Sequence, residues 1–148
     1  MPQLLKTKKF TLAAITAAMA ATLAIVLLFS ADNNVNRANL EFIASYGWRA
    51  DEKPTEIAHL TIPEEFDVVY ETYNHLEKEA GFDLTSHKGI RVTRYSYRIL
   101  NHRESDSGLI RANLFVSKDG IVAADICSLA LDGFMIPIND TSDLIDTP

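Results

Sequence analysis

The chain has 148 residues, the length of one domain, and 47% of them are hydrophobic, which excludes a disordered or fibrous protein. A single cysteine excludes a small domain held together by disulfides. The net charge of −6 becomes −9 over residues 31–148, because the first thirty residues contain three lysines and no acidic residue; nucleic acid is excluded as a partner, since phosphate binding needs a basic surface.

The N-terminal segment has the pattern of a membrane anchor. No residue from Phe10 to Phe29 is charged, and a helix of about 20 residues spans the hydrocarbon core of a bilayer. Three lysines precede this run and Asp32 follows it, so the positive-inside rule places the N-terminus in the cytoplasm. The sequence therefore predicts a cytoplasmic tail over residues 1–9, a transmembrane helix over residues 10–30 that contacts the lipid bilayer, and a domain outside the cell membrane.

A cleaved signal peptide is the alternative, because a basic start followed by an apolar run describes both. A cut at the end of the run would leave Phe29 or Leu28 at the −3 position, where a small residue is needed. A retained anchor is therefore the preferred interpretation. Ala13, Ala17 and Ala21 form a small-xxx-small row that would allow weak self-association of two anchors, although the simpler interpretation is a span that is merely rich in alanine.

The first helix of the outer part is predicted over residues 35–46, where apolar side chains recur at helical spacing. Asp32, Asn33 and Asn34 precede it as candidate N-caps. Gly47 suits the left-handed position that follows a helix, and Trp48 would then pack back against the helix.

A second, amphipathic helix is predicted over residues 63–80. Pro63 stands at its start, with Thr61 and Glu64 at the spacing of a capping box. Gly81 and Phe82 would end it. Its apolar face comprises Phe66, Val69, Tyr70, Tyr73, Leu76 and Ala80, and Glu71, Asn74 and Lys78 lie opposite.

Segments rich in alternating and β-branched residues predict strands over residues 56–62, 90–100, 109–116 and 121–127. Asp119-Gly120 is the clearest turn, since this pair supplies the positive φ of a tight hairpin, and the last three strands should form an antiparallel meander. Residues 129–138 form a candidate edge strand, and residues 139–148 a flexible tail. These elements predict an α+β domain over residues 31–138, a two-layer sandwich of two helices on a mostly antiparallel sheet, in the order helix, strand, helix and three or four strands.

No catalytic signature is present: the chain lacks GxSxG, HExxH, CxxC, a P-loop and a Gly-rich dinucleotide turn. The four histidines have no metal-ligand spacing and are interpreted as surface residues. Cys127, on a strand expected to be buried, is interpreted as a small hydrophobic residue. The sequence therefore predicts no catalytic residue, no cofactor and no metal site.

One strand pattern indicates a candidate binding surface. In residues 121–127 strict alternation places Asp125 on one face with Ile121, Ala123 and Cys127. A buried carboxylate needs a partner, and arginines on the adjoining strands are the candidates. The favoured interpretation is a cross-strand ion pair that fixes the register, and the alternative is a surface for an anionic or peptide ligand. The residues of this candidate surface are Arg94, Tyr95, Tyr97, Arg98, Arg111 and Asp125.

Several short motifs, in order, resemble an uncharacterised family, the domain of unknown function numbered forty-eight thirty, over about residues 35–137. They include Ser45-Tyr46-Gly47-Trp48, Gly81-Phe82-Asp83-Leu84, Arg94-Tyr95-Ser96-Tyr97, Arg111-Ala112-Asn113-Leu114 and Leu131-Asp132-Gly133-Phe134-Met135. The resemblance implies a short protein of clostridia-like Gram-positive bacteria with one N-terminal membrane segment. It implies no activity.

The function expected from the sequence is non-enzymatic: a single-pass, membrane-anchored domain that binds an envelope protein or peptide outside the cell membrane. The alternative is an envelope hydrolase or redox protein whose site, built from Asp125, Cys127 or histidines, is assembled only in space.

Overall fold

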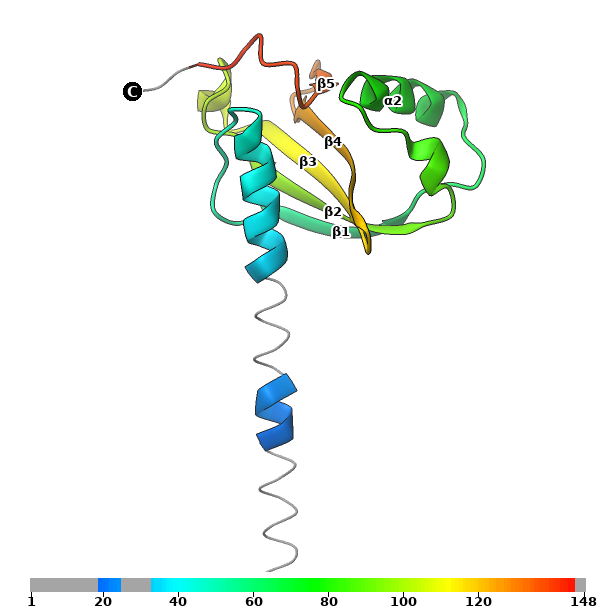
Figure 1. Ribbon diagram of the computed structural model, residues 1–148. Coiled ribbons are helices and arrows are strands. Elements are labelled where there is room, and N and C mark those ends of the chain that lie inside the picture. The colour runs from blue at the N-terminus through cyan, green and yellow to red at the C-terminus, as the bar shows by residue number, and fades with distance from the viewer. Residues whose placement is uncertain (1–18, 25–32, 146–148) are drawn as a thin grey trace, which may run out of the picture. The chain divides into compact units, whose positions relative to one another are not determined.

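The computed structural model describes residues 19–24 and 33–145 (Figure 1). The chain divides into two compact units, residues 1–37 and residues 38–148. In the first unit, residues 19–24 are helical and exposed. Most of the predicted transmembrane span over residues 10–30, and all of the predicted tail over residues 1–9, lie outside the described residues. Among the residues that are described, no helix is long and apolar enough to cross a membrane.

The second unit is built on a five-stranded antiparallel sheet with the strand order β1-β2-β3-β4-β5. The strands are β1 (Glu56–Thr61), β2 (Arg91–Arg98), β3 (Ile110–Ser117), β4 (Gly120–Ser128) and β5 (Met135–Pro137). Two short 3-10 helices, η1 (Leu84–His87) and η2 (Ser105–Ser107), lie in the connections. The predicted α+β class and the predicted antiparallel meander are confirmed.

The β3–β4 hairpin turns at Gly120, whose φ of 131° is open to glycine and strained for other residues. A register shift between Phe115 and Val116 marks a bulge beside this turn. The bulge turns Ile121 to the opposite face, where it is partly buried against the core cluster, whereas strict alternation groups it with Asp125. Ala123, Asp125 and Cys127 share one face as predicted, because the register beyond the bulge is regular.

Residues 33–45 form a helix, and its residues from Ala38 onward pack across one face of the sheet (Figure 1). The helix ends as predicted at Gly47, which has a φ of 87°. Trp48 is 1% exposed, shares the core cluster with Ile43, and donates its indole N–H to the Ile138 carbonyl at 2.8 Å. The remaining buried members of this core are Tyr97, Ile99, Ile110, Ala112, Leu114, Ala124, Ile126 and Ile138.

The second helix, α2 (Val68–Glu79), begins five residues later than the sequence predicts. The capping box at Thr61 and Glu64 is wrong: the N-cap is Asp67, whose carboxylate accepts the Tyr70 backbone N–H at 2.9 Å. Because Asp67 caps the helix directly, Pro63 lies in the connection after β1. The predicted end is confirmed, since the Phe82 N–H donates to the Glu77 carbonyl at 3.0 Å, as in a Schellman motif.

The face of α2 that is buried also differs from the prediction. Asn74 and Glu77 are 4% and 0% exposed, whereas Val69, predicted to face the core, is 73% exposed and Val68 is 81% exposed. The burial of the polar Asn74 side chain is compensated by a hydrogen bond, because its amide oxygen accepts the Leu84 N–H at 2.7 Å. The polar contacts of α2 therefore set its rotation, and part of its apolar stripe remains exposed.

The two helices do not share one face of the sheet as the predicted sandwich implies. Helix α2 lies beside the β4–β5 edge of the sheet (Figure 1). Tyr73 contacts Phe115, with ring centroids 5.9 Å apart, and Phe115 points away from the helix of residues 33–45 because it alternates with the core residue Leu114.

Residues 139–145 belong to the segment that the sequence predicts to be a flexible tail. They contact the domain: the Arg103 N–H donates to the Asp143 carbonyl at 2.8 Å, and the Ile145 N–H donates to the Asn101 carbonyl at 2.9 Å. Leu144 packs against the core.

Replacing Asp67 with Ala should lower the free energy of unfolding by about 1 kcal/mol, because the Tyr70 N–H loses its acceptor. Urea unfolding monitored by circular dichroism measures the change. Thr61→Ala is the matched control and should change the free energy of unfolding by only about 0.3 kcal/mol. If Thr61→Ala lowered the free energy of unfolding more than Asp67→Ala does, the helix would begin near Pro63, as the sequence predicts.

Candidate functional site

The sheet face opposite the helix of residues 33–45 is polar. We call it the polar face; its side chains are Arg94, Ser96 and Arg98 of β2, Arg111 and Asn113 of β3, and Asp125 and Cys127 of β4. Cross-strand register sets Ser96 beside Asn113 and Asn113 beside Asp125. Because directly paired residues lie close together, this register aligns three polar side chains in one row.

The structure divides the six predicted surface residues between the two faces. The three arginines and Asp125 lie on the polar face, whereas Tyr95 and Tyr97 point to the core under the helix of residues 33–45. Tyr97 is 0% exposed, and its hydroxyl accepts the Asn39 amide N–H at 3.0 Å. The two tyrosines therefore belong to the core side of the sheet and not to an exposed binding surface.

The aligned row is a continuous chain of hydrogen bonds. The Ser96 hydroxyl donates to Asn113 Oδ1 at 2.7 Å, and Asn113 Nδ2 donates to Asp125 Oδ1 at 2.8 Å. Tyr73 of α2 donates its hydroxyl to Asp125 Oδ2 at 2.9 Å. Both carboxylate oxygens of Asp125 are thus satisfied at an exposure of 1%.

The expected ion pair between Asp125 and an arginine is not formed. Arg94 Nη2 instead pairs with Glu56 Oε1 at 2.7 Å, and Arg111 Nη1 donates to backbone carbonyls of Gly108 and Ile110 at 2.8 and 3.0 Å. The prediction fails because Asn113 and Tyr73 already occupy the acceptor positions of Asp125.

Glu77 and Asp125 are two buried acids next to each other. Burial raises the pKa of Glu77 to about 7. The hydrogen bond from Ala124 opposes this shift, and the charge of Asp125 adds to it. Burial also raises the pKa of Asp125 to about 6, against the hydrogen bonds from Asn113 and Tyr73 and the charge of Arg94. Glu77 Oε2 accepts the Ala124 N–H at 2.8 Å, and Oε1 is buried with no hydrogen-bond partner. A protonated Glu77 suits this environment better than a carboxylate.

Cys127 borders the same row. It is 8% exposed, and its Sγ lies 3.2 Å from Asn113 Nδ2. Burial, followed by the charge of Asp125, raises the pKa of the thiol. A raised pKa reduces the thiolate fraction, so the environment does not activate this cysteine as a nucleophile.

The histidines lie elsewhere. His102, interpreted from the sequence as a surface residue, is 0% exposed and stacks between Trp48 and Phe134, with ring centroids 5.9 and 5.3 Å apart. Its Nδ1 accepts the Glu104 N–H at 3.0 Å. Over residues 19–24 and 33–145, no group of three or more His, Cys, Asp or Glu is placed to hold a metal ion.

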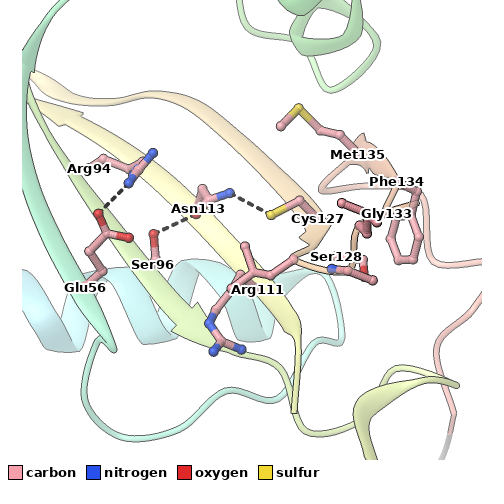
Figure 2. Close-up of a pocket in the computed structure, with 13 residues that line it drawn as sticks. Glu56, Arg94, Ser96, Arg111, Asn113, Cys127, Ser128, Gly133, Phe134 and Met135 are labelled. Atoms are coloured by element: carbon pink, nitrogen blue, oxygen red, sulfur yellow. Dashed lines mark hydrogen bonds and ion pairs between the residues drawn. The ribbon is translucent and has the colours of Figure 1, made fainter. Parts of the chain in front are cut away.

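A pocket of about 490 Å³ opens on the polar face (Figure 2). Ser96, Asn113 and Cys127 form its floor. Arg94 and its partner Glu56 lie on one side of the pocket, and Arg111 also lines it. The segment from Ser128 to Met135 forms the other side, where Leu131 is fully exposed. The pocket combines guanidinium groups with a fixed polar floor, which is the chemistry of anion or peptide binding.

Sequence reasoning missed five residues of this site: Ser96, Asn113, Glu56, Tyr73 and Glu77. The first two carried a signal, because both are polar residues within strands next to predicted partners of Asp125. The role of Glu77 carried none. Its position is set by the hydrogen bond from the Ala124 N–H at the edge of β4, a contact between residues 47 positions apart in the sequence.

Glu77→Gln should flatten the dependence of stability on pH. The carboxyl group titrates near 4.5 when unfolded and near 7 when folded, so its contribution to stability is complete below about pH 4.5 and is lost as the pH rises through about 7. A shift of this size corresponds to roughly 3 kcal/mol at most. Urea unfolding should show that the free energy of unfolding of the unmodified chain falls from pH 5 to pH 8. The fall should be smaller in Glu77→Gln, which keeps an acceptor for the Ala124 N–H.

The matched control is Glu79→Gln, an exposed position in the last turn of the same helix. It should leave the slope between pH 5 and pH 8 unchanged. Equal slopes for the unmodified chain and Glu77→Gln would show that Glu77 is already ionised at pH 5.

Comparison with known proteins gives one family match. Residues 42–126 match a domain of unknown function, DUF4830, and this segment contains the whole row from Tyr73 to Asp125. No curated protein and no solved structure matches the chain. The match spans more than half of the chain and confirms the predicted family over residues 42–126, whereas the motif at residues 131–135 lies beyond the matched segment. The protein belongs to the DUF4830 family.

Proposed function

We propose that the domain is a non-enzymatic binding module that uses the pocket on the polar face to hold an anionic segment of an envelope protein or peptide. The observation that carries the proposal is the pocket itself, where Arg94 and Arg111 flank a floor that is already hydrogen-bonded. A floor with satisfied polar groups is rigid, and rigid arginines lose little freedom when they bind a carboxylate.

The charge distribution supports an anionic ligand. Residues 31–148 carry a net charge of −9, yet three arginines gather on the polar face. Of the acids near this face, Glu56 pairs with Arg94, and Asp125 is buried and has a raised pKa. The polar face is therefore a local cationic surface on an acidic domain.

The site chemistry favours binding over catalysis. Hydrolysis by a cysteine needs a thiolate with a neighbouring base, whereas Cys127 has a raised pKa and its nearest polar partner is the Asn113 amide. The paired acids Glu77 and Asp125 are 0% and 1% exposed, so neither presents a carboxylate to the pocket.

The proposed location is the outer face of a bacterial cell membrane, with one N-terminal span over residues 10–30 and the N-terminus in the cytoplasm. It is supported by the uncharged run from Phe10 to Phe29 and the lysines that precede it.

A photo-crosslinking amino acid at Leu131 should give a discrete adduct with one partner in intact cells, because this position is exposed at the rim of the pocket. Combining it with Arg94→Gln and Arg111→Gln should reduce the adduct about tenfold or more, since charge-assisted hydrogen bonds are lost. Mass spectrometry of the adduct measures the yield.

Two controls accompany this experiment. The same crosslinker at His75, exposed on α2 and outside the pocket, should give no such adduct, and Arg91→Gln, an exposed arginine of β2, should leave the Leu131 adduct unchanged. An adduct that persists after both pocket arginines are replaced would refute anionic recognition.

Alkaline carbonate extraction of membranes should leave the full chain in the pellet, because an uncharged span over residues 10–30 remains in the bilayer. Release of the intact chain into the supernatant would contradict the anchor. N-terminal sequencing that begins near Ala31 would show instead that the segment is a cleaved signal peptide.

A further inference from the structure

A second hollow lies beside the pocket, between α2 and the polar face. We call it the α2 groove. Its volume is about 830 Å³, and apolar side chains dominate its lining, among them Val68, Val69, Leu76, Phe115 and Met135, with Arg94 as the charged residue. Arg94 and Met135 line both this groove and the pocket. The size is that of sites for small organic molecules.

The groove exposes side chains that a helix normally buries. Val68 and Val69 are 81% and 73% exposed and Met135 is 46% exposed, while Asn74 and Glu77 occupy the buried side of α2. Polar contacts hold this rotation: Asn74 accepts the Leu84 N–H and Glu77 accepts the Ala124 N–H. A contiguous apolar surface kept open by buried polar bonds is typical of a binding site.

Arg94 supplies the polar end of the groove. Its Nη2 is engaged by Glu56 at 2.7 Å, but its Nε is buried and has no hydrogen-bond partner. A guanidinium offers five N–H donors, and the Arg94 side chain is 32% exposed. A second acceptor beside Glu56 can therefore reach the exposed part of this guanidinium, where a charge-assisted hydrogen bond forms.

We propose that the α2 groove binds a small amphipathic carboxylate, with its apolar chain along Val68, Val69 and Phe115 and its carboxylate at Arg94. The proposal depends on neither the membrane span nor the envelope partner. It requires one carboxylate and one apolar chain, so a neutral molecule with the same chain binds more weakly. No bond is made or broken.

The test uses the full chain and two photoreactive probes that differ only in charge: octanoic acid carrying a diazirine on its chain, and the corresponding octanol. The acid should label α2, β3 near Phe115 or β5 near Met135, and mass spectrometry of the digested chain should show about tenfold less labelling there by the alcohol. Unmodified octanoate should displace the acid label and octanol should not.

Variants test the two ends of the groove separately. Arg94→Gln should reduce labelling by the acid about tenfold and leave labelling by the alcohol unchanged, and Arg91→Gln should alter neither. Val69→Glu should reduce labelling by both probes, whereas His75→Glu, which places the same charge on the exposed side of α2, should not.

Three results would overturn the proposal: equal labelling by the acid and the alcohol, no displacement by octanoate, or labelling no stronger in the groove than at His75, which is exposed on α2 and lines neither hollow. A loss of fold in Arg94→Gln would be seen by circular dichroism, and the displacement result on the unmodified chain decides that case. Failure here leaves the crosslinking at Leu131 as an independent test of the envelope partner.

Discussion

The hydrogen bond from the Ala124 N–H to Glu77 determines the arrangement of the site. Strand β5 pairs only with residues 125–127 of β4, so the rest of this edge would present unpaired backbone groups. Glu77 Oε2 accepts the Ala124 N–H at 2.8 Å and so satisfies one of these backbone groups. This contact ties α2 to the sheet edge, buries Glu77, and rotates Val68 and Val69 into the open. The groove thus follows from the way in which one sheet edge is covered.

A second consequence concerns charge. Burying Glu77 brings its carboxyl group near Asp125. Burial raises the pKa of both groups, and the charge of Asp125 raises that of Glu77 further. The domain keeps Asp125 without an ion pair by giving it two hydrogen-bond donors, Asn113 and Tyr73. The arginines of the polar face consequently remain directed to Glu56, to backbone carbonyls and to the pocket.

The strands were predictable because their signals are local. Alternation, β-branched residues and the Asp119-Gly120 turn define β2, β3 and β4 to within two residues, and the glycine stops at Gly47 and Gly81 were read correctly. The site was predictable only in part. Alternation alone grouped Arg94 with Asp125, but it could not show which sheet face the first helix covers, and Tyr97 was therefore misplaced. The rotation of α2 was inaccessible, since it is set by Ala124 and Leu84, which are 47 and 10 residues distant from their partners.

Arg94 connects these features. It lines both the pocket and the groove, and its charge lowers the pKa of Asp125 against the larger effect of burial. A carboxylate bound at Arg94, as proposed, would offset that charge and favour protonation of Asp125. Linkage is reciprocal, so protonation of Asp125 would strengthen the binding of the anion by the same factor. Affinity for an anionic ligand should therefore increase as the pH falls through about 6, although the ligand never contacts the buried acid.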